Sequence, residues 1–429
     1  MSEVRSVEAV EAVEAVEAYP VAVEVTAVGD PGPAQSKKEK KSKSRKISIA
    51  PAAENPPDSG PASTPAPDAA PAGFTMASLA SSQTEELADI DQNIDAAAIR
   101  TFLATHHFPT GLIETIVESS IRAGPRYYVV DDSGSMDTGD GERIIHSDTR
   151  AGEANHVHCT RWEELGDSLR FHAGLVHASK MQAQFRFING PRTHMPGDGK
   201  RGMDKILSVL DDPPSGVTPL CRHMKEVVDE IEHFAPALRQ HRRKAIICIF
   251  TDGCPSDGDL VTVLNRLVDL PVWLMVRLST NEDEVVSYWN SLDARLEVDM
   301  DILDDPQAEA DEIHKLNPWL SYNYFLHRIR EFGLIIREFD MLDEHAMSPP
   351  QIRRFLARLF NVQVEDIPDP VNDLNHFMHF VTDHQKHLIP PVVHNLHMKK
   401  PEPWVMPTEL RHHVHDFGKV KKKGGCALL

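Results

Sequence analysis

The sequence lacks long apolar runs and is poor in cysteine. No stretch of 18 or more apolar residues occurs, so no transmembrane helix is expected. Glutamate recurs at every third position near the start of the chain, which leaves no apolar core for a secretory signal. The cysteines are scattered, with no Cys-x-x-Cys pair and no dense framework, so free thiols in a reducing compartment are the simplest interpretation. The five cysteines are Cys159, Cys221, Cys248, Cys254 and Cys426.

Positive charge is also scarce. The 429 residues contain 45 Lys and Arg against 65 Asp and Glu, which gives a formal net charge of −20. This balance disfavours a general nucleic-acid binder, which would be expected to present a basic face. Hydrophobic residues make up 41% of the chain, enough to build a sizeable core.

The first part of the chain is compositionally biased. Val-Glu-Ala triplets run from Val7 to Ala18, a basic block spans Lys37 to Lys46, and a Pro/Ala/Ser tract follows from Ala50 to Ala72. Such segments bury too little apolar surface to offset chain entropy. We therefore predict a disordered low-complexity arm over 1–88. A short helical segment with two helices is expected over 89–123.

Apolar strand-like runs alternate with amphipathic helical patterns along the middle of the chain. Expected strands are 127–130, 185–188, 245–250, 271–278 and 298–303, and expected helices are 162–176, 220–231, 260–267 and 285–296. Strands that are apolar on both faces are typical of a sheet covered by helices on both sides. We predict a doubly wound, mostly parallel α/β domain over 124–317. A helical C-terminal extension is expected over 318–418, with helices at 348–360 and 373–388.

Oxygen-bearing side chains stand at the predicted strand ends. Asp131, Ser133 and Ser135 follow the first strand, Asp252 follows the strand 245–250, and Thr218 precedes a helix. In an open α/β sheet, ligands bind at the carboxyl ends of the strands. These side chains are hard oxygen donors with few carboxylates among them, which suits Mg²⁺, with Mn²⁺ or Ca²⁺ as further options. Such a site leaves the ion electrophilic, so it would seek an acidic ligand from outside.

With these residues, the region from about Gly124 to Leu316 resembles the von Willebrand factor A (integrin I-like) family, in an intracellular form. The family's Asp-x-Ser-x-Ser element matches at Asp131, Ser133 and Ser135, its threonine falls on Thr218 and its aspartate on Asp252. The resemblance implies a complete metal-ion-dependent adhesion site. It also implies that Thr218 joins the ion when a ligand is bound and that Asp252 acts directly or through water.

One segment departs from the family pattern. The polar stretch between Met136 and Thr160 is longer than the usual connection to the first long helix. We expect it to hang over the metal face, where it could gate the site or contribute to partner choice. A surface insertion without such a role is the alternative.

Enzymatic readings find little support in the sequence. A haloacid-dehalogenase-like phosphatase needs a second aspartate two positions after the first, where this chain has Ser133. A Gly-x-Ser-x-Gly nucleophile elbow and a phosphate-binding loop are both absent. Histidines spaced i, i+3 occur in the C-terminal part, at His376/His379, His384/His387 and His394/His397. Zinc sites sometimes use that spacing, but solvated or partner-facing histidines are the default interpretation.

The chain ends in a polybasic stretch and a C-a-a-X box. Cys426 is followed by Ala427, Leu428 and a terminal leucine, which favours geranylgeranylation. One lipid anchors only marginally, so a second signal is needed. Four nearby lysines supply it at an anionic membrane surface. They are Lys419, Lys421, Lys422 and Lys423.

Taken together, these patterns predict a Mg²⁺-dependent protein-binding adaptor and not an enzyme. The expected partner is a protein with an exposed Asp or Glu, and the expected location is cytoplasmic and peripheral on membranes. The alternative is a structural subunit of a larger cytoplasmic assembly, in which the same domain makes a fixed contact. Reversible binding that chelation abolishes would distinguish the first reading from the second.

Overall fold

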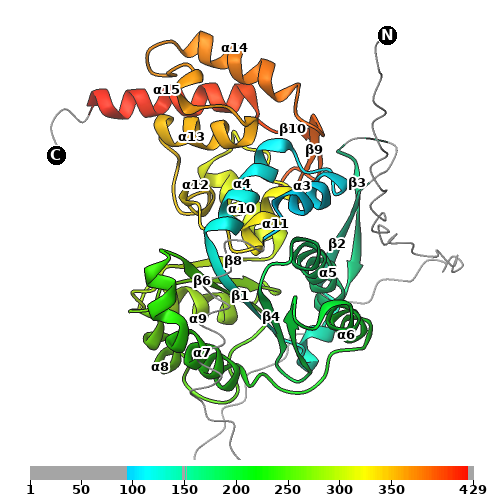
Figure 1. Cartoon of the computed structure of the whole chain (residues 1–429). Coiled ribbons are helices and arrows are strands. Elements are labelled where there is room, and N and C mark those ends of the chain that lie inside the picture. Colours follow the sequence, from blue (N-terminus) through cyan, green and yellow to red (C-terminus); the bar gives the residue numbers. More distant parts are fainter. Residues whose placement is uncertain (1–93, 147–149, 151, 424–429) are drawn as a thin grey trace, which may run out of the picture. The chain divides into compact units, whose positions relative to one another are not determined.

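A six-stranded sheet forms the centre of the computed structural model. The structure describes residues 94–146, 150 and 152–423, except for the side chains of 146 and 418–423. The strand order is β5-β4-β1-β6-β7-β8 (Figure 1). All neighbours pair in parallel except β5, which is antiparallel to β4. The strands are β1 (Ala123–Val130), β4 (Ala183–Phe187), β5 (Arg192–Met195), β6 (Lys244–Thr251), β7 (Val272–Leu278) and β8 (Met300–Leu303). The prediction of a mostly parallel α/β sheet is confirmed. The predicted arm over 1–88 lies outside the described residues.

Alternate residues of the buried strands belong to two different cores. Tyr128 and Val130 of β1 face a core shared with α5 (Arg161–Ser179) and α6 (Gly199–Asp211). Tyr127 and Val129 face the opposite core. That second core is built with α7 (Leu220–Gln240), α8 (Leu260–Leu264), the short 3-10 turn Asn265–Leu267 and α9 (Asp283–Asp293). Because side chains alternate along a strand, apolar residues at every position let both faces of the sheet be covered.

The connections reverse direction at β1. After β1 the chain builds β4 and β5 on one side, and then crosses to β6, β7 and β8 on the other. The carboxyl ends of β1 and β6 therefore lie next to each other where the winding changes direction, and their loops diverge. This is the position at which open α/β sheets bind ligands.

Within the described residues, two helices precede the sheet and connect it to the C-terminal extension. They are α3 (Ala96–Thr105) and α4 (Thr110–Arg122), where the sequence predicts two short helices. Gly111 of α4 lies so close to α13 (Pro349–Phe360) that a Cβ there would stand 2.0 Å from the carbonyl oxygen of Arg358. Glycine is therefore required for this close helix contact.

The sequence suggested a helical extension, but the extension also contains two strands. α10 (Pro306–Leu316) precedes the extension and closes the sheet domain. The extension itself contains α11 (Tyr324–Glu331), α12 (Arg337–Asp340), α13, the 3-10 turn Val364–Asp366, α14 (Leu374–Gln385) and α15 (Pro407–Lys423). Between α14 and α15, β9 (Val392–Asn395) and β10 (Lys400–Pro403) form an antiparallel pair. These strands are short and β10 carries two prolines, so they leave no alternating pattern to read. Among the described helices, none is long and apolar enough to cross a membrane.

The polar segment 136–160 departs from its predicted position. It opens with a 3-10 turn (Gly134–Asp137) and then forms a hairpin from β2 (Gly141–His146) and β3 (Ala154–Cys159). The described part of the hairpin reaches the extension, where Nε2 of His156 lies 2.7 Å from Nε2 of His394 on β9 (Figure 1). It meets the candidate site through Thr138 and Asp140, before the hairpin begins. The expectation that the segment hangs over the metal face therefore fails for the hairpin strands, which contact the extension through His156 and Glu142, whereas Thr138 and Asp140 do lie at the site.

Candidate metal centre

Two carboxylates meet at the carboxyl ends of β1 and β6. Asp131 directly follows β1, and its backbone N–H donates to the carbonyl oxygen of Phe250 in β6 at 2.8 Å. Asp252 directly follows β6. Asp131 and Asp252 are 1% and 3% exposed, so the sheet holds both acids almost out of solvent. Burial of two acids side by side calls for compensating donors or a cation.

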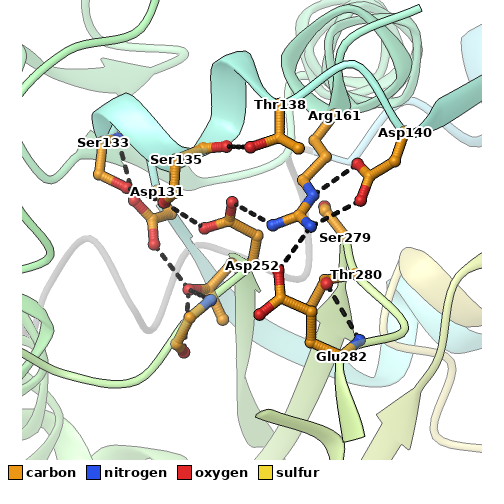
Figure 2. Close-up of polar contacts among 12 residues, drawn as sticks. Asp131, Ser133, Ser135, Thr138, Asp140, Arg161, Asp252, Ser279, Thr280 and Glu282 are labelled. Carbon is orange, nitrogen blue, oxygen red and sulfur yellow. Dashed lines mark hydrogen bonds and ion pairs between the residues drawn. The ribbon is translucent and has the colours of Figure 1, made fainter. Parts of the chain in front are cut away.

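Neutral donors hold Asp131 in place. The backbone N–H of Ser133 donates to Oδ1 of Asp131 at 3.0 Å (Figure 2). The hydroxyl of Thr251 donates to Oδ2 of Asp131 at 2.6 Å. Burial is the main cause that raises the pKa of Asp131, to about 6, and the neighbouring Asp252 adds to the rise. The hydrogen bonds from Ser133 and Thr251 act against that rise. A cation beside this carboxyl group would favour its ionised form.

The two serines connect Asp131 to Asp252. The hydroxyl oxygens of Ser133 and Ser135 lie 3.1 Å apart, and the Ser135 hydroxyl donates to Oδ1 of Asp252 at 2.8 Å. Ser133 is buried, whereas Ser135 is exposed and opens the group to solvent. The structure thus brings together four of the five residues that the sequence proposes as ligands.

The fifth residue, Thr218, lies on a loop that is attached to the same turn. The backbone N–H of Ser215 donates to the carbonyl oxygen of Asp132 at 2.8 Å, and that of Gly134 donates to the carbonyl oxygen of Gly216 at 3.2 Å. Thr218 is half-buried, and its carbonyl oxygen accepts from the backbone N–H of Ser256 at 2.9 Å. Among the described residues, the Thr218 side chain makes no hydrogen bond. The loop is nevertheless held against the Asp-x-Ser-x-Ser turn.

Asn189 fixes how the Thr218 loop approaches. Its side-chain amide donates to Oδ1 of Asp132 at 3.2 Å and to the carbonyl oxygen of Val217 at 2.8 Å. Gly216 has a φ of +105°, and a Cβ there would lie 2.5 Å from Oδ1 of Asn189. Glycine is therefore needed at 216 both for the backbone conformation and for the space that Asn189 occupies.

Arg161 is a part of the site that sequence reasoning missed. Its Nη1 donates to Oδ2 of Asp252 at 2.9 Å, its Nε and Nη2 donate to the two oxygens of Asp140 at 2.7 Å, and Nη2 also donates to Glu282 at 2.8 Å (Figure 2). The hydrogen bond to Asp140 is the main cause that raises the pKa of Arg161, and Arg161 in turn lowers the pKa of Asp140. The guanidinium is therefore a permanent positive charge at the edge of the site.

One signal in the sequence could have led to part of this arrangement. Glu282 stands shortly after β7, the strand next to β6, so the same strand-end argument that selects Asp252 applies to it. Arg161 has no comparable signal. It is the first residue of α5, after the N-cap Thr160, and that position alone predicts a solvated side chain.

The geometry is compatible with Mg²⁺. Neighbouring oxygen ligands of an octahedral Mg²⁺ at roughly 2.0–2.1 Å lie about 2.9 Å apart. The spacings of 3.1 Å between Ser133 and Ser135, and of 2.8 Å between Ser135 and Asp252, match that edge. No group of three or more His, Cys, Asp or Glu side chains in the described residues is placed to hold a metal. Serine and threonine hydroxyls would therefore have to supply ligands beside Asp131 and Asp252.

In the described residues, the C-terminal histidines have separate partners and do not gather in one cluster. His394 contacts His156, and Nδ1 of His397 lies 2.6 Å from Oδ1 of Asp311. His384 stacks on Phe380. Cys426 lies outside the described residues, and the side chains of the four tail lysines do too. Across the part of the chain that the structure describes, these i, i+3 pairs therefore do not combine with further ligands into a group of three or more that could hold a metal.

The chain was also compared with known proteins. Neither protein-family models nor curated proteins gave a match.

Proposed function

We propose that the sheet domain is a divalent-cation-dependent protein-binding module of the von Willebrand factor A type, with helices wound on both faces of its sheet. One observation carries the proposal: Ser133, Ser135 and Asp252 present oxygens at the edge lengths of an Mg²⁺ octahedron, next to Asp131 at the switch point of the sheet. Asp131, Ser133 and Ser135 would hold the ion, with Asp252 beside them and Thr218 on the adjoining loop. The ion would supply a Lewis-acidic position for a carboxylate oxygen of a partner.

The electrostatics of the site suit an acidic partner. The ion would be held largely by hydroxyl groups. The negative charge of Asp252 is already partly neutralised by its ion pair with Arg161. The exposed Ser135 marks the side from which a partner's Asp or Glu would approach. The same arrangement does not favour a hydrolase, because in the described residues no histidine or lysine side chain forms a hydrogen bond with Ser133 or Ser135 and could act as a base.

Metal binding tests the proposal directly. Calorimetric titration of the full chain with Mg²⁺ or Mn²⁺ should show one site, and Asp131→Ala should abolish it while the circular dichroism spectrum stays unchanged. Asp137→Ala, on the exposed neighbouring turn, is the matched control and should bind as the wild type does. Equal affinity in Asp131→Ala and wild type would show that the ion binds elsewhere.

A chelation experiment separates an adaptor from a fixed structural subunit. Partner capture from the native cell that EDTA abolishes and Mg²⁺ restores supports the adaptor. Capture that persists in EDTA supports the fixed contact. Turnover of a phosphoester that disappears in Ser133→Ala would overturn the binding module altogether.

We also propose that the tail tethers the module to cytoplasmic membrane surfaces. The support is the sequence Cys426-Ala427-Leu428-Leu429 with the lysines before it. The lipid and the basic charge would act together on an anionic leaflet.

A further inference from the structure

Arg161 lies at the meeting point of three loops. Asp140 precedes β2, Asp252 follows β6 and Glu282 precedes α9, and the guanidinium donates to all three carboxylates (Figure 2). Four hydrogen bonds to carboxylates are formed by a group that has five N–H donors. The side chain is 4% exposed. This arginine is therefore held in one orientation.

The three ion pairs differ in their exposure to water. The side chains of Asp140 and Glu282 are 52% and 62% exposed, whereas that of Asp252 is fully buried. Solvent and salt screen exposed pairs strongly and buried pairs much less. The positive charge of Arg161 therefore acts chiefly on Asp252 and on the space beside it.

Arg161 makes the two carboxylates of the candidate site unequal. Asp131 accepts from neutral donors, the N–H of Ser133 and the hydroxyl of Thr251. Asp252 has Ser135 on Oδ1 and the guanidinium on Oδ2. Asp252 can therefore offer an ion one oxygen at most, from a carboxylate whose charge is partly neutralised.

We propose that Arg161 is a positioning residue that weakens the hold of this site on the metal and strengthens its hold on the carboxylate of a partner. The inference rests on the proposed function. A fixed positive charge beside the site opposes a second cation and favours an incoming anion. Its effects on metal and on carboxylate therefore have opposite signs. A purely structural arginine would shift both affinities in the same direction.

The test measures both affinities in the full chain. The Mn²⁺ dissociation constant is obtained by electron paramagnetic resonance, and acetate, the probe for an acidic side chain, is followed by water-proton relaxation at saturating Mn²⁺. In Arg161→Met, Mn²⁺ should bind more tightly and acetate more weakly, each by about tenfold, the size of one charge a few ångströms away in a partly solvated site. Arg161→Lys keeps the charge and should stay near wild type for both.

A second variant guards against misfolding of Arg161→Met. The double variant Asp140→Asn/Glu282→Gln keeps the Arg161–Asp252 pair and removes the two exposed acids that share the guanidinium. It should shift both affinities the other way, with weaker Mn²⁺ and tighter acetate binding, and by less than Arg161→Met does because solvent screens these two acids. Acetamide, which is neutral, should bind none of the variants.

The results distinguish a failure of the proposed role of Arg161 from a failure of the proposed function. If Arg161→Met binds Mn²⁺ more tightly and acetate more weakly, and Arg161→Lys keeps both affinities near those of the wild type, the positioning role of Arg161 is supported. Loss of both affinities, or no change in either, overturns it while the proposed function stands, because the wild type still binds Mn²⁺ and acetate. A wild-type chain that binds no Mn²⁺ overturns the proposed function and this inference with it.

Discussion

The hydroxyl of Ser168 in α5 donates a 2.6 Å hydrogen bond to Oε2 of Glu331 at the end of α11. This contact joins the helix that carries Arg161 to the C-terminal extension. Glu331 is 1% exposed and lies at ion-pair distance from Arg277 and Arg328, 3.3 and 3.1 Å respectively. Burial alone would favour its neutral form, but Arg328, with His327, holds the pKa of Glu331 well below its usual range. The sheet and the extension therefore share one buried ionic network.

Glu331→Gln should destabilise the protein strongly. Removing this charge leaves buried arginines short of a partner, at a cost of about 3–5 kcal/mol in the free energy of unfolding. Ser168→Ala, which removes one neutral donor, should cost about 1 kcal/mol. Urea unfolding at pH 7 measures both, and a Glu331→Gln loss no larger than that of Ser168→Ala would contradict the network.

The Glu331 effect also has a pH signature. Because its folded pKa is depressed, Glu331 contributes stability that is fully present above its unfolded pKa of about 4.3 and is lost as the pH falls through the folded value. The difference between wild type and Glu331→Gln should therefore be constant at neutral pH and shrink only in strong acid.

Asp340, unlike Glu331, should lower the free energy of unfolding at neutral and higher pH. Burial, with Asp301 and Glu344 nearby, raises its pKa to about 7. An acid with a raised folded pKa makes the folded state bind more protons, so stability falls as the pH rises from about 4 through 7. Asp340→Asn should therefore raise the unfolding free energy at pH 8 by about 1–3 kcal/mol, allowing for partial exposure, and leave it unchanged at pH 4. Glu365→Gln, on the surface, is the control, and an equal gain at both pH values would refute the linkage.

Thr218→Ala should separate metal from ligand binding. The resemblance to the adhesion-site family implies that this threonine engages the ion when a ligand is bound, and its loop is held against the Ser133 turn without a side-chain hydrogen bond to it among those described. Acetate binding at saturating Mn²⁺ should weaken more than Mn²⁺ binding itself. Val217→Ala, the exposed neighbour, should change neither. Equal losses of both affinities would argue against this role.

The tail prediction concerns residues at the very end of the sequence. A prenyl chain contributes roughly 0.8 kcal/mol per buried CH₂ yet binds reversibly alone. The four lysines together add about 4 kcal/mol at low salt and less when screened. Cys426→Ser should therefore release the protein to the soluble fraction, and replacing the four lysines with glutamine should release it in part. An unmodified, full-length C-terminal peptide by mass spectrometry of native protein would refute prenylation.

Much of the site could be predicted because its elements are local in sequence. Apolar runs with a strand's length predict β1 and β6, and Asp131 and Asp252 stand directly after them. Parallel strands place their carboxyl ends at one edge, so a one-dimensional pattern is enough to bring these residues together. Their role as metal ligands stays a prediction.

The long-range contacts of Arg161 and of Glu331 could not be predicted in this way. Arg161 and Asp252 are 91 residues apart, and Ser168 and Glu331 are 163 apart. A charged residue at a helix start or on a helix face is usually solvated, and nothing in its neighbours along the chain says that it will be buried. The hairpin β2–β3 was misplaced for the same reason, since its partner His394 belongs to a strand without a readable pattern.

The sequence by itself therefore determined the α/β sheet, its strand ends and the oxygen side chains that stand on them, because periodicity and strand termini are properties of short segments. Only the tertiary structure decided that Arg161 pairs with Asp252 and how the extension joins the sheet. Ion pairs such as Arg161–Asp252 and Arg328–Glu331 form only where packing excludes water, and that exclusion depends on segments that are distant along the chain.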